Sequence, residues 1–449
     1  MSALPTVALI TNDAIGAKMA GPGIRYWELA GALARRGFDV QLLVPPYVPP
    51  EGDPPTGQAF TVTAPRTAAE LRALAAESDV LMTLGIVLAY YPFLATLGKP
   101  LVGDLYDPFL LAGLQRTAAE PLPRQLEANR HYLAALHTLL RAGDFFLCAA
   151  EKQRDYWLGM LSALGRLNPY TYAHDPTFRR LIDVLPFGMP AQPPVHTQAV
   201  LKGVHPGIGP DDKVLLWGGG LWNWFDAPTL IRALPLILGQ RDDVKLFFMG
   251  TRRPNASVSR MDAVDEAVAL SKSLGLHGTH IFFNDWVPYE QRQNYLLEAD
   301  VGLSLHLDYV ETRFAFRTRL LDYLWAGLPI VATAGDVLGE DLAAWGLATL
   351  APPQDVEAVA AQVLAWLADD AARAAYRARA QEIAAGYRWD AVVEPLAAFC
   401  AAPRFAADRE RALGHEEGWG GKVRLALQTG GPRELWRQLR AYLRWKRQR

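Results

Sequence analysis

The residues best suited to chemistry lie between Glu311 and Val331, in the stretch ETRFAFRTRLLDYLWAGLPIV. Arg313, Arg317, Thr318 and Arg319 precede a segment whose apolar residues recur at helical spacing. The amino end of a helix has unpaired backbone N–H groups and the positive end of the helix dipole, so it favours an anion. The sequence therefore predicts a site just before this helix that could hold a diphosphate.

A helix and a strand must position the segment that contains Arg313, Arg317, Thr318 and Arg319. Apolar residues from Leu320 to Trp325 predict a helix with one side against a core. Gly327 should end that helix, because glycine accepts the left-handed backbone conformation, and Pro329 prevents the helix from resuming. Ile330 to Ala332 then predict a strand that is covered on both faces.

The segment DYLWAGLPIVAT resembles the EAxxxGxPVVAS segment of family-four retaining glycosyltransferases, which have the GT-B fold. The resemblance implies that Asp322 replaces the second glutamate of the family's Glu-x7-Glu motif, the carboxylate that binds the donor ribose. Phe314 stands where the first glutamate belongs, and the nearest acid, Glu311, is the candidate for its role. Alternatively, Asp322 is an exposed helix carboxylate paired with Arg319 three residues before it. Phe316, Thr318 and Arg319 are further donor-site candidates.

Composition narrows the function classes. The 449 residues predict two or three domains, and a net charge of −2 excludes a generally basic nucleic-acid binder. Cys148 and Cys400 are the two cysteines, which make neither a disulfide framework nor a metal-ligand cluster, and Cys148 should be a small buried residue. There is no Asp-x-Asp pair at a strand end, so we expect no metal and no cofactor beyond a co-substrate. With no signal-peptide pattern and no uncharged apolar run of transmembrane length, we expect a cytoplasmic protein.

The chain opens with a strand, a glycine loop, a helix and a second strand. Thr6–Ile10 is the first predicted strand, and the helix is expected from Arg25 onward. This order begins a doubly wound α/β domain. Gly21 and Gly23 allow close approach of the backbone, and the resemblance places this loop near the donor phosphates and the acceptor, with Arg25 on the acceptor side. A flexible surface loop is the alternative.

The segment GDLYDP follows a predicted strand that ends at Asp104. Ligands of open α/β sheets bind at the carboxyl ends of strands, so Asp104 and Asp107 should lie at the cleft edge, where they could bind or polarise an acceptor hydroxyl. Asp107 could instead cap a helix that starts at Pro108. We favour the cap for Asp107 and a site role for Asp104.

A second α/β series follows a proline-rich linker at 191–198. Its alternating strands and helices predict a second parallel sheet, and two such Rossmann-like domains facing a cleft are the GT-B arrangement. The predicted organisation is an acceptor-side domain at 1–190, a donor domain at 191–386, a closing helix at 387–403 that returns to the first domain, and a basic amphipathic tail at 404–449.

The donor site departs from the family at its phosphate cations. The family has G-R-x4-K after its first strand of the second domain, but Gly220 and Phe225 occupy the two cation positions here. Backbone N–H groups around Gly219 and Gly220 could form an anion nest. Arg252 and Arg317 are predicted to supply the missing positive charge.

Aromatic residues and a histidine complete the candidate list. Trp222 could cover the sugar or the base, or pack against the linker. Trp286 and Val287 lie in FNDWVP, which matches the segment where the family reads the nucleotide base. His306 is either a cleft residue or a core residue.

The resemblance implies transfer of a sugar from a nucleoside-diphosphate donor to a hydroxyl of a glycan or glycolipid acceptor, with retention of anomeric configuration. The leaving diphosphate would take the acceptor proton, so no protein nucleophile is needed. Asp104, Arg252, Glu311 and Arg317 are the residues predicted to act in catalysis. The alternative is a non-catalytic protein of the same fold that binds a nucleotide sugar or a partner protein.

The last segment has the pattern of an interfacial helix. From Arg404 onward there are 12 lysine and arginine residues against 5 acidic ones. Leu435, Trp436, Leu439 and Leu443 share one helical face among arginines. Residues 433–449 are therefore predicted to bind an anionic membrane surface, or else to pack on the first domain.

Overall fold

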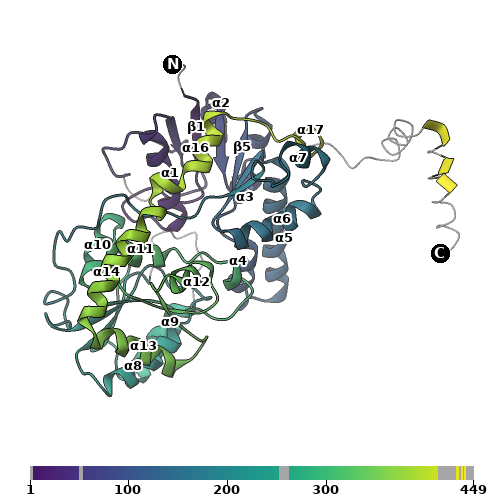
Figure 1. Cartoon of the computed structure of the whole chain (residues 1–449). Coiled ribbons are helices and arrows are strands. Elements are labelled where there is room, and N and C mark those ends of the chain that lie inside the picture. The colour runs from purple at the N-terminus through teal and green to yellow at the C-terminus, as the bar shows by residue number, and fades with distance from the viewer. Residues whose placement is uncertain are drawn as a thin grey trace.

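The computed structural model describes residues 4–49, 54–251 and 262–412, with 431–433, 436–437 and 439–440. They form two α/β domains, the first above the second in Figure 1, each built on one parallel sheet with helices on both faces. Away from the sheet edges, the strands are short and mostly buried on both faces, as parallel sheets require. The predicted fold of two Rossmann-like domains is confirmed, and the predicted boundary at 190 falls between the two sheets.

The first sheet has seven parallel strands in the order β3-β2-β1-β4-β5-β6-β7. Val7 of β1, an interior strand, pairs with Val40 on one side and Val80 on the other. The strands are β1 (Thr6–Ile10), β2 (Asp39–Leu43), β3 (Thr61–Thr63), β4 (Val80–Thr83), β5 (Leu101–Asp104), β6 (Phe145–Cys148) and β7 (Ile182–Val184). The helices are α1 (Gly21–Arg35), α2 (Ala68–Glu77), α3 (Gly85–Tyr90), α4 (Phe109–Arg116), α5 (Leu122–Ala142), α6 (Glu151–Ala163) and α7 (Pro169–His174).

The second sheet has six parallel strands in the order β10-β9-β8-β11-β12-β13. The strands are β8 (Lys213–Trp217), β9 (Val244–Phe248), β10 (Ile281–Phe283), β11 (Val301–Ser304), β12 (Ile330–Thr333) and β13 (Thr349–Ala351). The helices are α8 (Ala227–Leu238), α9 (Asp262–Ser273), α10 (Arg292–Glu298), α11 (Arg319–Ala326), α12 (Val337–Ala344), α13 (Val356–Ala368) and α14 (Asp370–Ala384).

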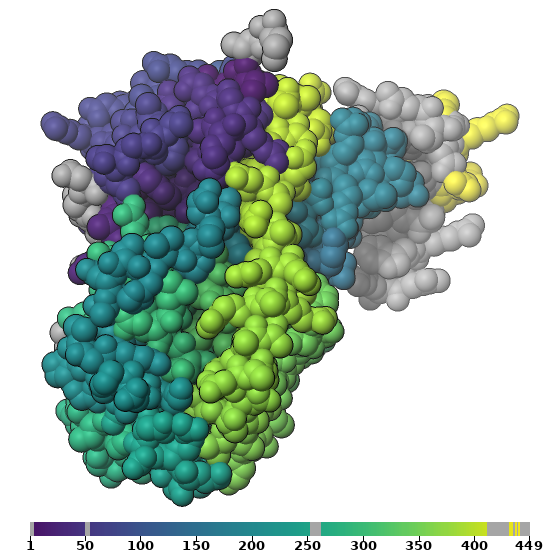
Figure 2. Space-filling view, turned by 60° about the vertical axis from the view of Figure 1, so that its left-hand side comes forward, coloured from purple at the N-terminus to yellow at the C-terminus, as the bar shows by residue number. Residues whose placement is uncertain are grey.

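The chain then returns to the first domain. Figure 2 shows the segment that begins with α14, in yellow-green, lying across both domains. It continues in α15 (Trp389–Val392) and α16 (Glu394–Ala401), two helices where one was expected. Phe399 stacks on Phe145 at 4.9 Å between ring centres, and Arg35 of α1 pairs with Asp390. These contacts attach the end of the second domain to the first.

A short helix, α17 (Arg409–Ala412), ends the continuous part of the structure. Before it, Asp408 forms a buried ion pair with Arg166, with Nε–Oδ2 at 2.9 Å. Most of the tail that was predicted to bind a membrane, including Leu435 and Leu443, lies outside the described residues. Among the residues that are described, no helix is long and apolar enough to cross a membrane.

Candidate active site

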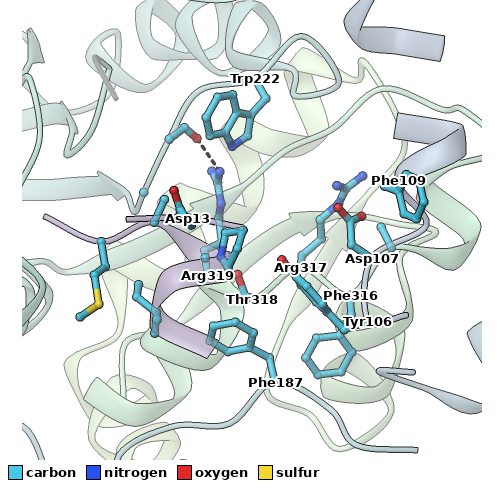
Figure 3. A pocket seen from close by; sticks show the side chains of 18 of the residues that line it. Asp13, Tyr106, Asp107, Phe109, Phe187, Trp222, Phe316, Arg317, Thr318 and Arg319 are labelled. Atoms are coloured by element: carbon cyan, nitrogen blue, oxygen red, sulfur yellow. Dashed lines mark hydrogen bonds between the residues drawn. The ribbon is translucent and has the colours of Figure 1, made fainter. Parts of the chain in front are cut away.

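A cavity of about 540 Å³ lies between the two domains, within the size range of small-molecule sites. The first domain lines it with the segments that follow β1, β4, β5 and β7, and the second with those that follow β8, β10 and β11. Carboxyl ends of parallel strands from both sheets therefore meet at one site. Figure 3 shows its side chains, with Arg317, Thr318 and Arg319 from the second domain facing Asp13 and Asp107 from the first.

Helix α11 forms as predicted and holds the glycine loop in place. Gly327 ends the helix in the left-handed conformation, with φ of 63°. Tyr323 is fully buried, and its hydroxyl accepts a hydrogen bond from the Gly218 backbone N–H at 2.7 Å and donates to the Leu303 carbonyl at 2.8 Å. Gly302 leaves room for this ring, because a Cβ there would lie 2.6 Å from it. The loop at 218–220 is thereby fixed beside the amino end of α11.

Arg319 lies under this glycine loop with its positive charge unbalanced. Its Nη2 donates to the Gly220 carbonyl at 2.7 Å, and its guanidinium lies 4.6 Å from the centre of the Trp217 ring and 4.0 Å from that of Phe225. Its Nη1 is buried without a hydrogen-bond partner, and burial lowers its pKa to about 10. Within the described residues it forms no ion pair. An anion that enters the cavity could therefore form one with it.

Arg317 differs from Arg319 because it is already neutralised. Its Nη1 and Nη2 donate to the two carboxylate oxygens of Glu311 at 3.1 and 2.7 Å, and both side chains are buried. Glu311 and Arg317, which were both predicted to act in catalysis, thus form an internal ion pair that borders the cavity. The aromatic ring of Phe225 lies beneath both arginines, at 5.2 Å from the Arg317 guanidinium. The resemblance predicts a lysine at position 225. Phe225 carries no charge there, but its ring lies against the guanidinium groups of Arg317 and Arg319.

Asp322 borders the cavity, but its partner is not the predicted one. Its Oδ1 accepts a hydrogen bond from the Nε of Arg292 at 3.1 Å, so the alternative that paired it with Arg319 is wrong. Arg292 is held between the rings of Tyr289 and Trp325, at 3.7 and 4.8 Å from their centres. The Asp322 side chain keeps 34% of its surface exposed, which leaves it accessible to a ligand.

Asp104 and Arg25 bind each other. Arg25 donates from Nε and Nη2 to both oxygens of Asp104 at 2.9 and 3.0 Å, and both side chains are fully buried. Arg25 also donates to the carbonyls of Leu185 and Pro186. The pair therefore ties α1 to β5 and to the segment after β7. Although Asp104 borders the cavity, this geometry corrects both expectations: neither side chain is free to contact an acceptor.

Asp107 faces the cavity, and the prediction that it caps a helix is wrong. Helix α4 begins at Phe109 after Pro108, without a side-chain cap. Burial, with a smaller contribution from Glu311, raises the pKa of Asp107 to about 6, while Arg116 and Arg317 act in the opposite direction. Figure 3 shows Asp107 beside Arg317. A carboxyl group with this pKa can accept or donate a hydrogen bond near neutral pH.

The first glycine segment is helical and not a loop. Gly21 and Gly23 lie in the first turn of α1, which begins four residues earlier than predicted, with Pro22 in its first turn. A Cβ at Gly23 would lie 2.8 Å from the Ala14 carbonyl oxygen, so glycine is required there by packing. A Cβ at Gly21 would meet nothing within 4 Å, and this residue borders the cavity.

The remaining second-domain candidates divide between the cavity and the core. Gly219, Gly220, Trp222, Trp286, Phe316 and Thr318 line the cavity. Val287 has its side chain in the core, and His306 is fully buried beside Asp336, with Nε2–Oδ2 at 3.4 Å. His306 is therefore a core residue. Arg252 lies outside the described residues.

Sequence reasoning missed several cavity residues. Arg116 lies seven residues after Phe109 on α4, a spacing that places both on one helix face and could have suggested a shared role. Asp13 follows the first strand, in a loop that was singled out for its glycines. No sequence pattern pointed to Arg292 or Tyr132, because they belong to segments that only the fold brings to the cavity. The missed side chains include Asn12, Asp13, Tyr106, Phe109, Arg116, Tyr132, Tyr289 and Arg292.

The chain is similar over most of its length to several solved structures. Sucrose-phosphate synthase from Thermosynechococcus elongatus is 16% identical, with a TM-score of 0.63 over 88% of this chain and 98% of that one. WaaG, a glycosyltransferase of lipopolysaccharide biosynthesis, is 19% identical, with a TM-score of 0.60 over 88% and 100%. HepE of Anabaena in complex with UDP-glucose is 15% identical, with a TM-score of 0.61 over 89% and 100%.

These similarities define the class: the chain has the GT-B fold of two-domain glycosyltransferases. The family described as Glycosyl transferases group 1 matches residues 212–369, which span the second sheet and α11. The predicted resemblance to this family is thereby confirmed. No curated protein sequence matches the chain at a significant level. In the described part of the chain, no group of three or more His, Cys, Asp or Glu residues is placed to hold a metal ion.

Proposed function

We propose that this protein transfers a hexose from a nucleoside-diphosphate sugar to a hydroxyl acceptor with retention of anomeric configuration. The observation that carries the proposal is Arg319, a buried guanidinium that has no anionic partner in the part of the chain that the structure describes. It lies beside a glycine loop and a helix amino end, in a cavity between two GT-B domains. A donor diphosphate would supply the missing negative charge.

The donor would lie along the second domain. Arg319 and the backbone N–H groups around Gly219 and Gly220 would bind the diphosphate. Asp322, oriented by Arg292, would bind the ribose hydroxyls through its exposed carboxylate edge. Trp222 and Trp286 border the same side of the cavity. The similar HepE structure is a complex with UDP-glucose, which supports a nucleotide sugar as the donor class.

Catalysis in this arrangement would come from positioning and electrostatics. Negative charge grows on the diphosphate as it leaves, and Arg319 lies in a desolvated site where that charge is stabilised most strongly. The Glu311–Arg317 pair, which contributes no net charge, would fix the loop that carries Arg319. Asp107 would orient the acceptor hydroxyl on the opposite wall.

A non-catalytic nucleotide-sugar-binding protein is the second candidate, because Gly220 and Phe225 leave both family cation positions without charge. The two functions differ in one measurable product. A thermal-shift panel of nucleotide sugars would first identify the donor, since a ligand at 100 times its Kd stabilises by about 2.7 kcal/mol. Release of nucleoside diphosphate that depends on an acceptor then supports transfer, whereas binding without release supports the second candidate.

We further propose that the acceptor is a glycolipid or surface-glycan intermediate and that the basic tail binds an anionic membrane surface. Each lysine or arginine near such a surface contributes about 1 kcal/mol, so binding should weaken with salt. Sedimentation with anionic liposomes at low salt tests this. Full-length protein should pellet and protein truncated after Pro403 should not; equal recovery in the supernatant would contradict membrane binding.

A further inference from the structure

The charged side chains of the cavity largely cancel in pairs. Glu311 pairs with Arg317, and Asp322 pairs with Arg292, while Asp104 is matched by Arg25 behind the cavity wall. Arg319 remains for the donor diphosphate. On the first-domain wall, Asp13 accepts a hydrogen bond from the Gly23 backbone N–H at 3.3 Å. Asp107 and Arg116 also lie on this wall; neither forms an ion pair among the described residues, although the Arg116 charge lowers the pKa of Asp107.

Arg116 is held in place by Tyr132, a residue that carries no charge. On α4, Gly113 gives space to the ring of Tyr132 from α5, because a Cβ at Gly113 would lie 2.7 Å from that ring. One turn later, the Nη1 of Arg116 donates to the Tyr132 hydroxyl at 3.2 Å, and its guanidinium lies 5.8 Å from the ring centre. The Nε of Arg116 is buried without a partner. The guanidinium is therefore oriented by α5 and forms no ion pair among the described residues, while the carboxyl group of Asp107 is close enough for the two charges to interact.

The surroundings of Arg116 suit a sugar that carries a negative group. Phe109 packs edge-on against Tyr132 at 6.3 Å between ring centres, and Tyr106 and Phe187 also line this wall. Aromatic faces pack against the apolar faces of sugar rings, and a carboxyl group such as that of Asp107 binds their hydroxyls. A neutral acceptor would leave Arg116 unpaired in a partly desolvated site, whereas a phosphate or carboxylate would form charge-assisted hydrogen bonds with it.

We propose that the acceptor carries a phosphate or carboxylate group that binds Arg116, with its reactive hydroxyl directed toward Asp107. The proposal rests on the proposed transferase function, since it assigns the first-domain wall to the acceptor. It makes the enzyme selective for anionic acceptors, and Arg116 is the residue that determines that selectivity.

Equilibrium binding of four probes to the full chain, with the donor side filled by a nucleoside diphosphate, tests the proposal. The probes are glucose, glucuronate, glucose 6-phosphate and glycerol 3-phosphate. The wild-type protein should bind at least one anionic probe about tenfold or more tightly than glucose, as expected for a hydrogen bond to a charged group. Glycerol 3-phosphate separates a lipid head group from a sugar phosphate as the source of the anion.

Matched variants connect the preference to Arg116. Arg116→Gln should abolish the preference for the anionic probe, and Arg116→Lys should restore part of it. Arg124→Gln, an exposed arginine on the neighbouring helix, should keep the full preference. Equal binding of neutral and anionic probes by the wild type, absence of anionic-probe binding at millimolar concentration, or an unchanged preference in Arg116→Gln would each overturn the proposal. Nucleoside-diphosphate binding, measured in the same samples, reports separately on the proposed function.

Discussion

Replacing Arg319 with glutamine should weaken nucleoside-diphosphate binding about 10- to 150-fold with little loss of folding stability. A hydrogen bond to a charged group is worth about 1.5–3 kcal/mol, and each 1.4 kcal/mol is tenfold in affinity. The effect on stability has two opposing parts. The variant loses the bond to Gly220 and the ring contacts, but it also removes a buried charge.

The stability gained by removing the buried charge follows from the pKa of Arg319. Burial lowers this pKa from 12.5 to about 10, so the folded state disfavours the charged form by ~3 kcal/mol at any pH well below 10. Lost contacts of ~2–4 kcal/mol offset this gain, which leaves a net change of about 1 kcal/mol or less.

Isothermal titration with UDP, GDP and ADP, beside urea unfolding of the ligand-free protein, measures both quantities. Arg313→Gln is the matched control, because Arg313 belongs to the same loop but is exposed and does not line the cavity. The control should bind as the wild type does. If Arg319→Gln binds the preferred nucleotide within twofold of the wild type, Arg319 does not hold the diphosphate.

Three further predictions concern other cavity residues. Asp322→Asn should reduce nucleotide affinity about 10- to 150-fold and erase any preference for the ribonucleotide over its 2′-deoxy form; a preference that survives in titrations would exclude ribose binding by Asp322. Arg317→Gln should destabilise the fold by about 3–5 kcal/mol because it leaves Glu311 buried without its partner, and the double change with Glu311→Gln should recover part of this in urea unfolding. If the single variant unfolds like the wild type, the pair is not a stabilising one. Folding raises the pKa of Asp107 from 3.8 to about 6, so its ionised form destabilises the folded state above that pH and has no such effect below about pH 4. Asp107→Asn should therefore raise the free energy of unfolding near pH 8 by about 1–3 kcal/mol but not near pH 4, and equal changes at both pH values would contradict the pKa assignment.

Local patterns predicted the elements that position the site. The run from Leu320 to Gly327 determines α11 and its end, because apolar spacing and a left-handed glycine act within one segment. Long strands such as Val244–Phe248 were recognisable as buried apolar runs. The edge strands Thr61–Thr63 and Thr349–Ala351 were missed, since neither has the continuous run of large apolar residues that marks a buried strand.

The pairing of charged side chains could not be predicted in this way. Arg25 and Asp104 are 79 residues apart, and their bond depends on the packing of α1 against β5. Glu311 and Arg317 are close in sequence, but a 3₁₀ turn at Thr312–Phe314 is what brings their side chains together. The cations that remain unpaired become visible only after these partners are assigned. For that reason Arg317 was predicted as the phosphate-binding cation, whereas the geometry favours Arg319.

The most direct test of sugar transfer is acceptor-dependent release of nucleoside diphosphate by the full chain. Nucleotide sugars that bind in the thermal-shift panel would be incubated with neutral and anionic glycan or glycolipid acceptors, and the anomeric configuration of any product would be determined by NMR. We predict release and a product of retained configuration for at least one pair, with turnover in Arg319→Gln reduced more than donor binding because charge grows on the leaving diphosphate. Donor binding without release for any acceptor, or turnover in Arg319→Gln equal to that of the wild type, would contradict the proposed function.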